Sequence, residues 1–223
     1  MKDQKSTWLV TLILALVAGY CDTVTFVSAD SIFSAHVTGN FIVFAYQLIK
    51  GSETLAWVKL LTFPVFIISV MIGGKIAAKA VDPYKLLLIE GLTLFTAGLL
   101  SAVFIRTPGL VWETYLVVMM VVAGMGLQNA FGKLYAKETF GPTTMMTGNV
   151  TQASLDLGKA ITSFFSDLAS VASLKKQLVI IGGFLIGCVA GALMSKLFGL
   201  SVLILPGAGL VICHLSTGRN SKL

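Results

Sequence analysis

Long apolar segments dominate the sequence and restrict its fold more than any other feature. They cover residues 8–27, 55–80, 85–105, 113–134, 178–198 and 200–215. About 20 apolar residues in a helix cross the ~30 Å hydrocarbon core of a bilayer. Because backbone N–H and C=O groups cannot remain unpaired in hydrocarbon, such segments cross as helices. We therefore expect an all-α integral membrane protein that forms a single transmembrane domain over residues 1–223.

The composition supports this expectation and excludes other classes. Hydrophobic residues make up 56% of the chain and charged residues only 12%, whereas about a quarter of a soluble domain is charged. The net charge of +6 is typical of cytoplasmic loops in a membrane protein, so we expect lipid and not nucleic acid as the surroundings. Cys21, Cys188 and Cys213 are an odd number without metal-ligand spacing. We expect no metal site and no cofactor.

A polar tripeptide occurs twice inside this apolar sequence. Thr38-Gly39-Asn40 and Thr147-Gly148-Asn149 each precede a helical run. Glycine interrupts a helix, and threonine or asparagine can cap the next one. A helix N-terminus inside the protein offers free N–H groups and a positive dipole end. Corresponding interruptions in two halves of a chain are typical of a transporter's binding site.

The two tripeptides divide the chain into two related halves, a first repeat over about residues 8–105 and a second over about 113–215. Small residues recur at every fourth position in the third helix of each half, which favours close packing between helices. These residues are Ser69, Gly73 and Ala77 in the first half and Gly183, Gly187 and Gly191 in the second.

Two topologies are compatible with the repeat. If each tripeptide segment re-enters the bilayer, the chain makes six full crossings and the halves are inverted repeats. If each segment spans the bilayer, there are eight crossings and the repeats are parallel. Positive residues concentrate on the cytoplasmic side, which favours six crossings, with both termini in the cytoplasm. On the opposite side that arrangement leaves Lys50, Lys59, Arg106 and Lys196.

Several polar residues in the apolar segments are candidates for function. Asp22 is the candidate coupling residue, because carboxylates at membrane depth mark ion or proton pathways. Gln128 and Asn129 are candidate substrate-binding residues together with the two tripeptides. Glu90 lies about five residues into its helix. A position at the headgroup level and a coupling role are equally open for it.

The motifs together resemble the YoaK family of small bacterial polytopic membrane proteins, long described as a domain of unknown function. The resemblance rests on Gly19-x-x-Asp22, both Thr-Gly-Asn tripeptides and Gly126-Leu127-Gln128-Asn129. It implies a multi-pass protein of the bacterial inner (plasma) membrane with transport as the expected role. It supplies no substrate.

The function that we expect is secondary transport of a small polar or anionic solute. The solute site would lie between the two Thr-Gly-Asn elements, which would meet in one polar cavity with Asp22 and allow coupling to protons. The alternative is a pseudo-symmetric channel for a small solute or ion. An intramembrane enzyme ranks last, because neither Gly-x-Ser-x-Gly nor His-Glu-x-x-His occurs. A scaffold and a homodimer are left open.

Overall fold

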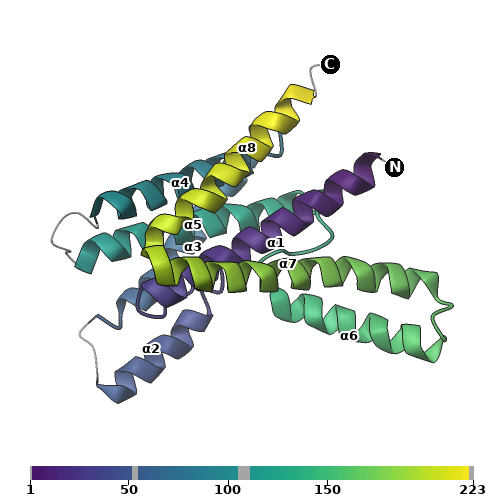
Figure 1. The fold of residues 1–223 in the computed structure, drawn as a ribbon, viewed down its shortest axis with the longest axis horizontal. Coiled ribbons are helices and arrows are strands. Elements are labelled where there is room, and N and C mark those ends of the chain that lie inside the picture. Colours follow the sequence, from purple (N-terminus) through teal and green to yellow (C-terminus); the bar gives the residue numbers. More distant parts are fainter. Residues whose placement is uncertain (1, 52–54, 105–110, 221–223) are drawn as a thin grey trace.

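The computed structural model describes residues 2–51, 55–104 and 111–220, with side chains described from residue 6 to residue 215 of these ranges. Within them every element of regular secondary structure is a helix (Figure 1). The helices are α1 (Lys2–Ser28), α2 (Gly39–Lys50), α3 (Val58–Ala77), α4 (Lys85–Phe104), α5 (Val111–Leu134), α6 (Met146–Thr162), α7 (Leu168–Phe198), the 3-10 helix η1 (Gly199–Leu203) and α8 (Ile204–Asn220). The turn predicted at residues 106–109, between the halves, lies outside the described residues.

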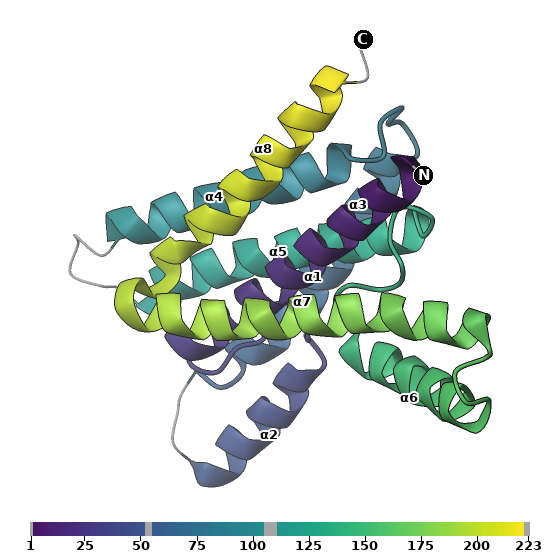
Figure 2. The same ribbon diagram turned by 45° about the vertical axis from the view of Figure 1, so that its right-hand side comes forward.

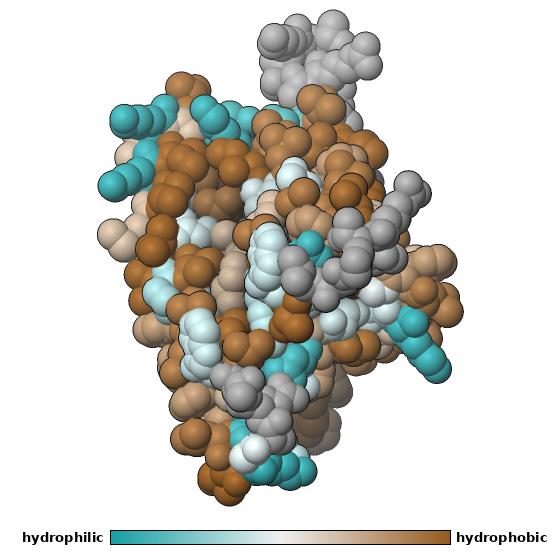
Figure 3. Space-filling model, turned by 90° about the vertical axis from the view of Figure 1, so that its left-hand side faces the viewer, coloured by the Kyte–Doolittle hydropathy of each residue, from teal (hydrophilic) through white to brown (hydrophobic). Residues whose placement is uncertain are grey.

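Five helical segments are long and apolar enough to cross a membrane. Four of them lie in α1, α3, α4 and α5, and the fifth, Leu168–Leu215, contains α7, η1 and most of α8. Apolar side chains such as Ile68, Met71, Leu185 and Leu193 are exposed on the outer faces of α3 and α7. Figure 3 shows hydrophobic residues over much of one face, with hydrophilic residues in small separate groups. These features are consistent with a multi-pass membrane protein, because lipid is the solvent that such faces require.

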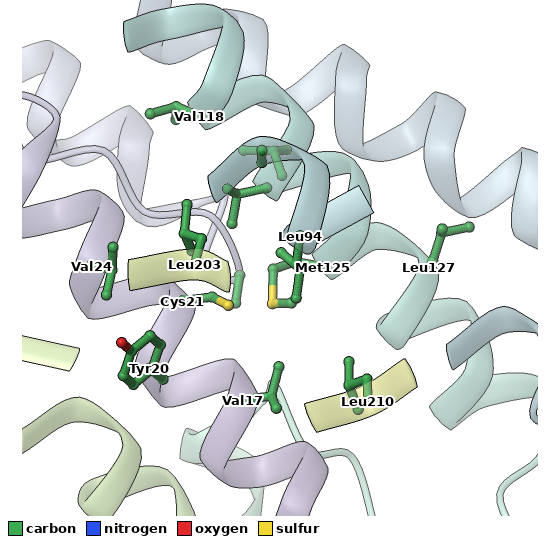
Figure 4. Close-up of a cluster of buried hydrophobic side chains, with 14 of the residues drawn as sticks. Val17, Tyr20, Cys21, Val24, Leu94, Val118, Met125, Leu127, Leu203 and Leu210 are labelled. Atoms are coloured by element: carbon green, nitrogen blue, oxygen red, sulfur yellow. The ribbon is translucent and has the colours of Figure 1, made fainter. Parts of the chain in front are cut away.

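The long helices pack in a reciprocal pattern. Helix α1 lies along α7, α3 lies along α5, and α4 packs on both α5 and α8 (Figures 1 and 2). The first helix of each predicted half thus contacts the third helix of the other. Side chains from α1, α4, α5, η1 and α8 fill the core between them, with Cys21, Leu94 and Met125 near its centre (Figure 4).

Small residues make the two reciprocal contacts possible. A Cβ atom on Gly187 would lie 2.1 Å from the backbone oxygen of Leu16, and one on Gly19 would lie 2.2 Å from that of Phe184. In the other pair, a Cβ on Gly126 would lie 2.8 Å from the Ser69 side chain. The expected role of the small-residue faces in close packing is confirmed.

Two boundaries differ from the expected ones. Helix α7 begins at Leu168, so that Lys175 and Lys176 lie inside it and do not precede it. Its 31 residues extend about 46 Å, which is longer than a bilayer core, and α6 packs along it. Near the C-terminus the helix is interrupted at Gly199, where φ is +61°. Pro206 lies in the first turn of α8, where proline is tolerated.

The short helices α2 and α6 carry the two tripeptides. In both ribbon views they begin near the middle of the molecule and diverge toward opposite ends (Figures 1 and 2). Helix α2 packs on α3, and α6 packs on α7.

The contact between α1 and α7 leads to a test with a matched control. Gly187→Ala should lower the free energy of unfolding in detergent by about 1–3 kcal/mol, because its methyl group meets the α1 backbone. Gly182→Ala, in the same helix, has nothing within 4 Å of the new Cβ and should be neutral or stabilising. Equal thermal stability of the two variants would contradict this packing.

Candidate functional site

Asp22 lies at the centre of a polar cluster where α1 approaches its C-terminal end. Only 4% of the residue is exposed. Its Oδ1 accepts hydrogen bonds from the backbone N–H of Ala35 at 2.8 Å and of His36 at 3.4 Å. Its Oδ2 is 2.5 Å from Nδ1 of His36. A carboxylate buried this deeply requires such donors, so Asp22 holds the segment between α1 and α2 against the helix.

His36 is the partner of Asp22 that its sequence spacing did not reveal. Its hydrogen bond to Asp22 raises the pKa of the imidazole above 6.5. Partial burial lowers this pKa, and the charge of Asp22 raises it further. The ring also makes edge contacts with Phe33 and Phe184. An ionisable pair is thus fixed between aromatic rings at the end of α1.

A cavity of about 580 Å³ opens beside this pair. Four elements form its wall: the last turns of α1, the segment before α2, the first turn of α2 and the middle of α7. Its lining includes Asp22, His36, Phe33, Thr38, Gly39 and Phe184. Its volume is in the range of small-molecule sites. Apolar and aromatic side chains make most of the wall, and the polar groups gather around Asp22.

The first tripeptide contributes to this cavity in two ways. Thr38 and Gly39 line it, and a Cβ on Gly39 would lie 3.1 Å from the Phe33 ring. Thr38 makes no side-chain cap, so the expected capping role is wrong for this residue. Asn40 is completely buried, and its side chain bonds to other parts of the protein.

Asn40 pairs with both backbone groups of one residue. Its Oδ1 accepts from the N–H of Phe33 at 2.8 Å, and its Nδ2 donates to the carbonyl of Phe33 at 2.8 Å. Nδ2 also donates to Oγ1 of Thr62 on α3 at 3.0 Å. Both amide protons are used, so Asn40 shapes the cavity from behind and has no donor left for a solute.

The second tripeptide lies in a different environment. Asn149 is buried and its Nδ2 donates to the carbonyl of Pro142 at 2.7 Å, seven residues earlier as in the Asn40–Phe33 pair. Thr147 and Gly148 are exposed. They line neither the large cavity nor a small cleft beside Gln128. A Cβ on Gly148 would meet nothing within 4 Å.

Gln128 and Asn129 hold the connection between α5 and α6. Nε2 of Gln128 donates to Leu14 O and to Thr143 Oγ1, both at 2.8 Å. Oδ1 of Asn129 accepts from Thr144 Oγ1 at 2.8 Å. Both residues line a cleft of only about 10 Å³.

The expectation of one cavity shared by both tripeptides is therefore corrected. Asp22 lies with the first tripeptide on the large cavity, and Gln128 and Asn129 lie on a separate cleft. The physical reason is local: Asn40 and Asn149 each satisfy backbone groups a few residues away in their own half, so the two breaks do not need each other.

The surroundings of two further charged residues, Lys59 and Glu90, were not predicted from the sequence. Lys59 is fully buried at the start of α3 and pairs with Asp30, which also accepts from Nε2 of Gln47 at 3.0 Å. A charged residue at the start of an apolar run could have indicated a buried partner. Glu90 is completely buried, so its side chain does not reach the surface of the protein.

These features are consistent with a helical multi-pass membrane protein that has a cavity beside the buried Asp22 and its partly exposed partner His36. Residues 10–216 match one protein family, DUF1275, described as proteins of unknown function, and the chain belongs to that family. No curated protein and no solved structure matches the chain. The expected membership in a family without assigned function is confirmed, whereas the YoaK name stays a resemblance.

The two asparagines differ in what their removal should do. Asn40→Ala removes three hydrogen bonds and leaves buried groups of Phe33 unpaired; each such group costs about 1–3 kcal/mol. Asn149→Ala removes the hydrogen bond to Pro142 and should cost about 1 kcal/mol. Thermal unfolding in detergent would measure this order, with Thr38→Ala as the control that loses no cap. A reversed order would contradict the role given to Asn40.

The Asp22–His36 pair predicts a pH dependence of stability. Because the folded-state pKa of His36 is raised, its contribution is fully present below its unfolded pKa and is lost as the pH rises through the folded value. The melting temperature of the wild type should therefore exceed that of His36→Gln most below pH 6.5, and the difference should shrink at alkaline pH. A difference independent of pH would show that protonated His36 does not stabilise the fold.

Proposed function

We propose that this protein is a secondary transporter of a small polar solute, with its binding site in the cavity beside Asp22 and His36. The observation that carries the proposal is a cavity of about 580 Å³ whose wall contains the buried Asp22 carboxylate and its partly exposed partner His36. Buried acids in membrane helices mark ion and proton pathways. Of the residues expected at the site, Asp22, Thr38 and Gly39 line this cavity.

The cavity wall favours a particular kind of solute. Phe26, Phe33 and Phe184 contribute aromatic faces, and Asp22 and His36 contribute the charged groups. Small-molecule sites combine an apolar wall with a few placed polar groups. A solute with a planar or apolar part and a polar group fits this wall better than a compact, strongly hydrated ion.

The Asp22–His36 pair supports coupling to protons. Histidine changes its charge near physiological pH, and small shifts in its surroundings move it across that range. Loss of the His36 proton would leave the Asp22 carboxylate without its charged partner at the cavity wall. Protonation and solute binding at this wall would then depend on each other.

The unequal halves support a carrier over a channel. The region around Asp22 is open, whereas its counterpart in the predicted repeat, around Asn129, is closed to about 10 Å³. In an inverted repeat the two regions face opposite sides of the membrane, and a carrier opens one of them at a time. A channel would hold a continuous path through both.

The proposal includes an orientation in the inner membrane. Both termini lie in the cytoplasm, six helices cross the bilayer, and α2 and α6 re-enter from opposite sides. The charge distribution supports this orientation. The Asp22 cavity then opens toward the outside.

Uptake by cells tests the proposal with a pair of variants on α2. Ile42 lines the cavity and is 75% exposed, whereas Ile49, seven residues later, is 89% exposed and is not part of the lining. Ile42→Trp should reduce uptake roughly tenfold or more, the result of losing about 1.4 kcal/mol of binding. Ile49→Trp should transport like the wild type at equal abundance.

The measurement is depletion of a defined mixture of small aromatic and amphipathic solutes from the medium, followed by mass spectrometry. A carrier coupled to protons should accumulate its solute and lose that accumulation when the proton gradient is collapsed. Uptake that stops at equal concentrations and ignores the gradient would favour the channel. Equal activity of the two tryptophan variants would place the solute elsewhere.

A further inference from the structure

We propose that Glu90 is a proton-binding site of this protein, filled and emptied through a cavity that opens on the side of the chain termini. This inference rests on the proposed transport function and adds a second acid to it. It starts from a carboxyl group that the cavity at Asp22 does not include.

Glu90 has no hydrogen-bond partner among the described residues. It is completely buried, and neither Oε1 nor Oε2 has a hydrogen bond within the described part of the chain. An isolated carboxylate in an apolar interior is so unfavourable that the group takes up a proton instead. In this conformation Glu90 is therefore the neutral acid.

The elements around Glu90 offer little to stabilise a negative charge. On α5, Gly124 lies against it, since a Cβ built there is 3.7 Å from Cγ of Glu90. On α8, Gly207 and Leu210 pack against the next residue, Gly91. On α1, the Cys21 thiol lies within electrostatic reach of Glu90. A thiol is a weak donor and gives no compensating charge.

A second cavity provides a path toward this acid. Its volume is about 130 Å³, enough for several water molecules. It opens among Ser6, Tyr84, Cys213 and His214 near the two termini, and its lining includes Leu14, Leu87 and Leu210. Leu87 is one helical turn before Glu90, and Leu210 touches the position of Gly91. The ionisable groups on this path are thus Tyr84, Cys213 and His214.

The position of Glu90 also connects it to the solute cavity. Cys21, which lies within electrostatic reach of Glu90, is followed directly by Asp22, which lines that cavity. The tight contact between α4 and α8 at Gly91 and Gly207 would have to open for water to reach a charged Glu90. Release of the proton would therefore favour a different arrangement of α4 and α8 from the one described here.

Infrared spectroscopy of the full chain in lipid vesicles tests the proton without any solute or transport. The wild type at neutral pH should show a protonated-carboxyl band that shifts in deuterated water and is absent from Glu90→Gln. Absence of any band that this substitution removes would overturn the proposal. If Glu90→Gln does not accumulate, labelling of the wild type with a hydrophobic carbodiimide decides: modification of Glu90 supports the neutral acid, and an unmodified Glu90 contradicts it.

A second readout tests the connection to the solute cavity. Cys188 lines that cavity, and Cys188→Ala identifies its signal. The ratio of maleimide labelling rates at Cys188 between wild type and Glu90→Gln should change as the pH rises, because only the wild type can lose the Glu90 proton. A constant ratio would overturn the connection while leaving the proton site in place. Failure of the uptake test with a positive infrared result would reject transport and not the proton site.

Discussion

Backbone groups that leave a helix inside an apolar protein must find partners there, and the arrangement around the cavity follows from this requirement. The chain leaves α1 after Ser28 and begins α2 at Gly39. Asp22 accepts from two N–H groups of the intervening segment, and Asn40 pairs with both backbone groups of Phe33. Because these bonds fix Phe33 and His36 against α1, the same interactions that satisfy the backbone also form the aromatic and ionisable wall of the cavity.

The close contact between α1 and α7 forms one side of that cavity. Gly19 and Gly187 bring the two backbones together, which places Phe184 and Cys188 opposite Asp22. The opposite side is held differently. Helix α2 is held to α3 by a hydrogen bond from Asn40 to Thr62 and by the ring contact between Phe41 and Phe63. Gln47 adds a hydrogen bond to Asp30, the partner of Lys59. The two sides of the cavity are therefore held by different kinds of contact, a close backbone approach on one side and side-chain contacts on the other.

The sequence predicted the long helices, but not the positions of the two tripeptides relative to each other. Apolar length alone predicted the long helices, and four-residue spacing predicted the faces that pack. The partner of Asp22 was not predictable, because His36 follows it by 14 residues across a non-helical segment of unknown path. The roles of Asn40 and Asn149 were misjudged for a related reason. A buried amide suits a solute or a backbone equally well, and only the position of Phe33 or Pro142 decides between them.

Asp22 and Glu90 are both buried, but their surroundings differ. Asp22 accepts hydrogen bonds from two backbone N–H groups and lies against the His36 ring, with all three donor atoms within 3.4 Å of its carboxylate. Among the described residues Glu90 has no hydrogen-bond donor, so its apolar position suits the neutral form. Since Cys21 and Asp22 are consecutive in α1, a shift of that helix turn alters both environments at once. A proton gained near one acid would then change the state of the other without passing directly between them.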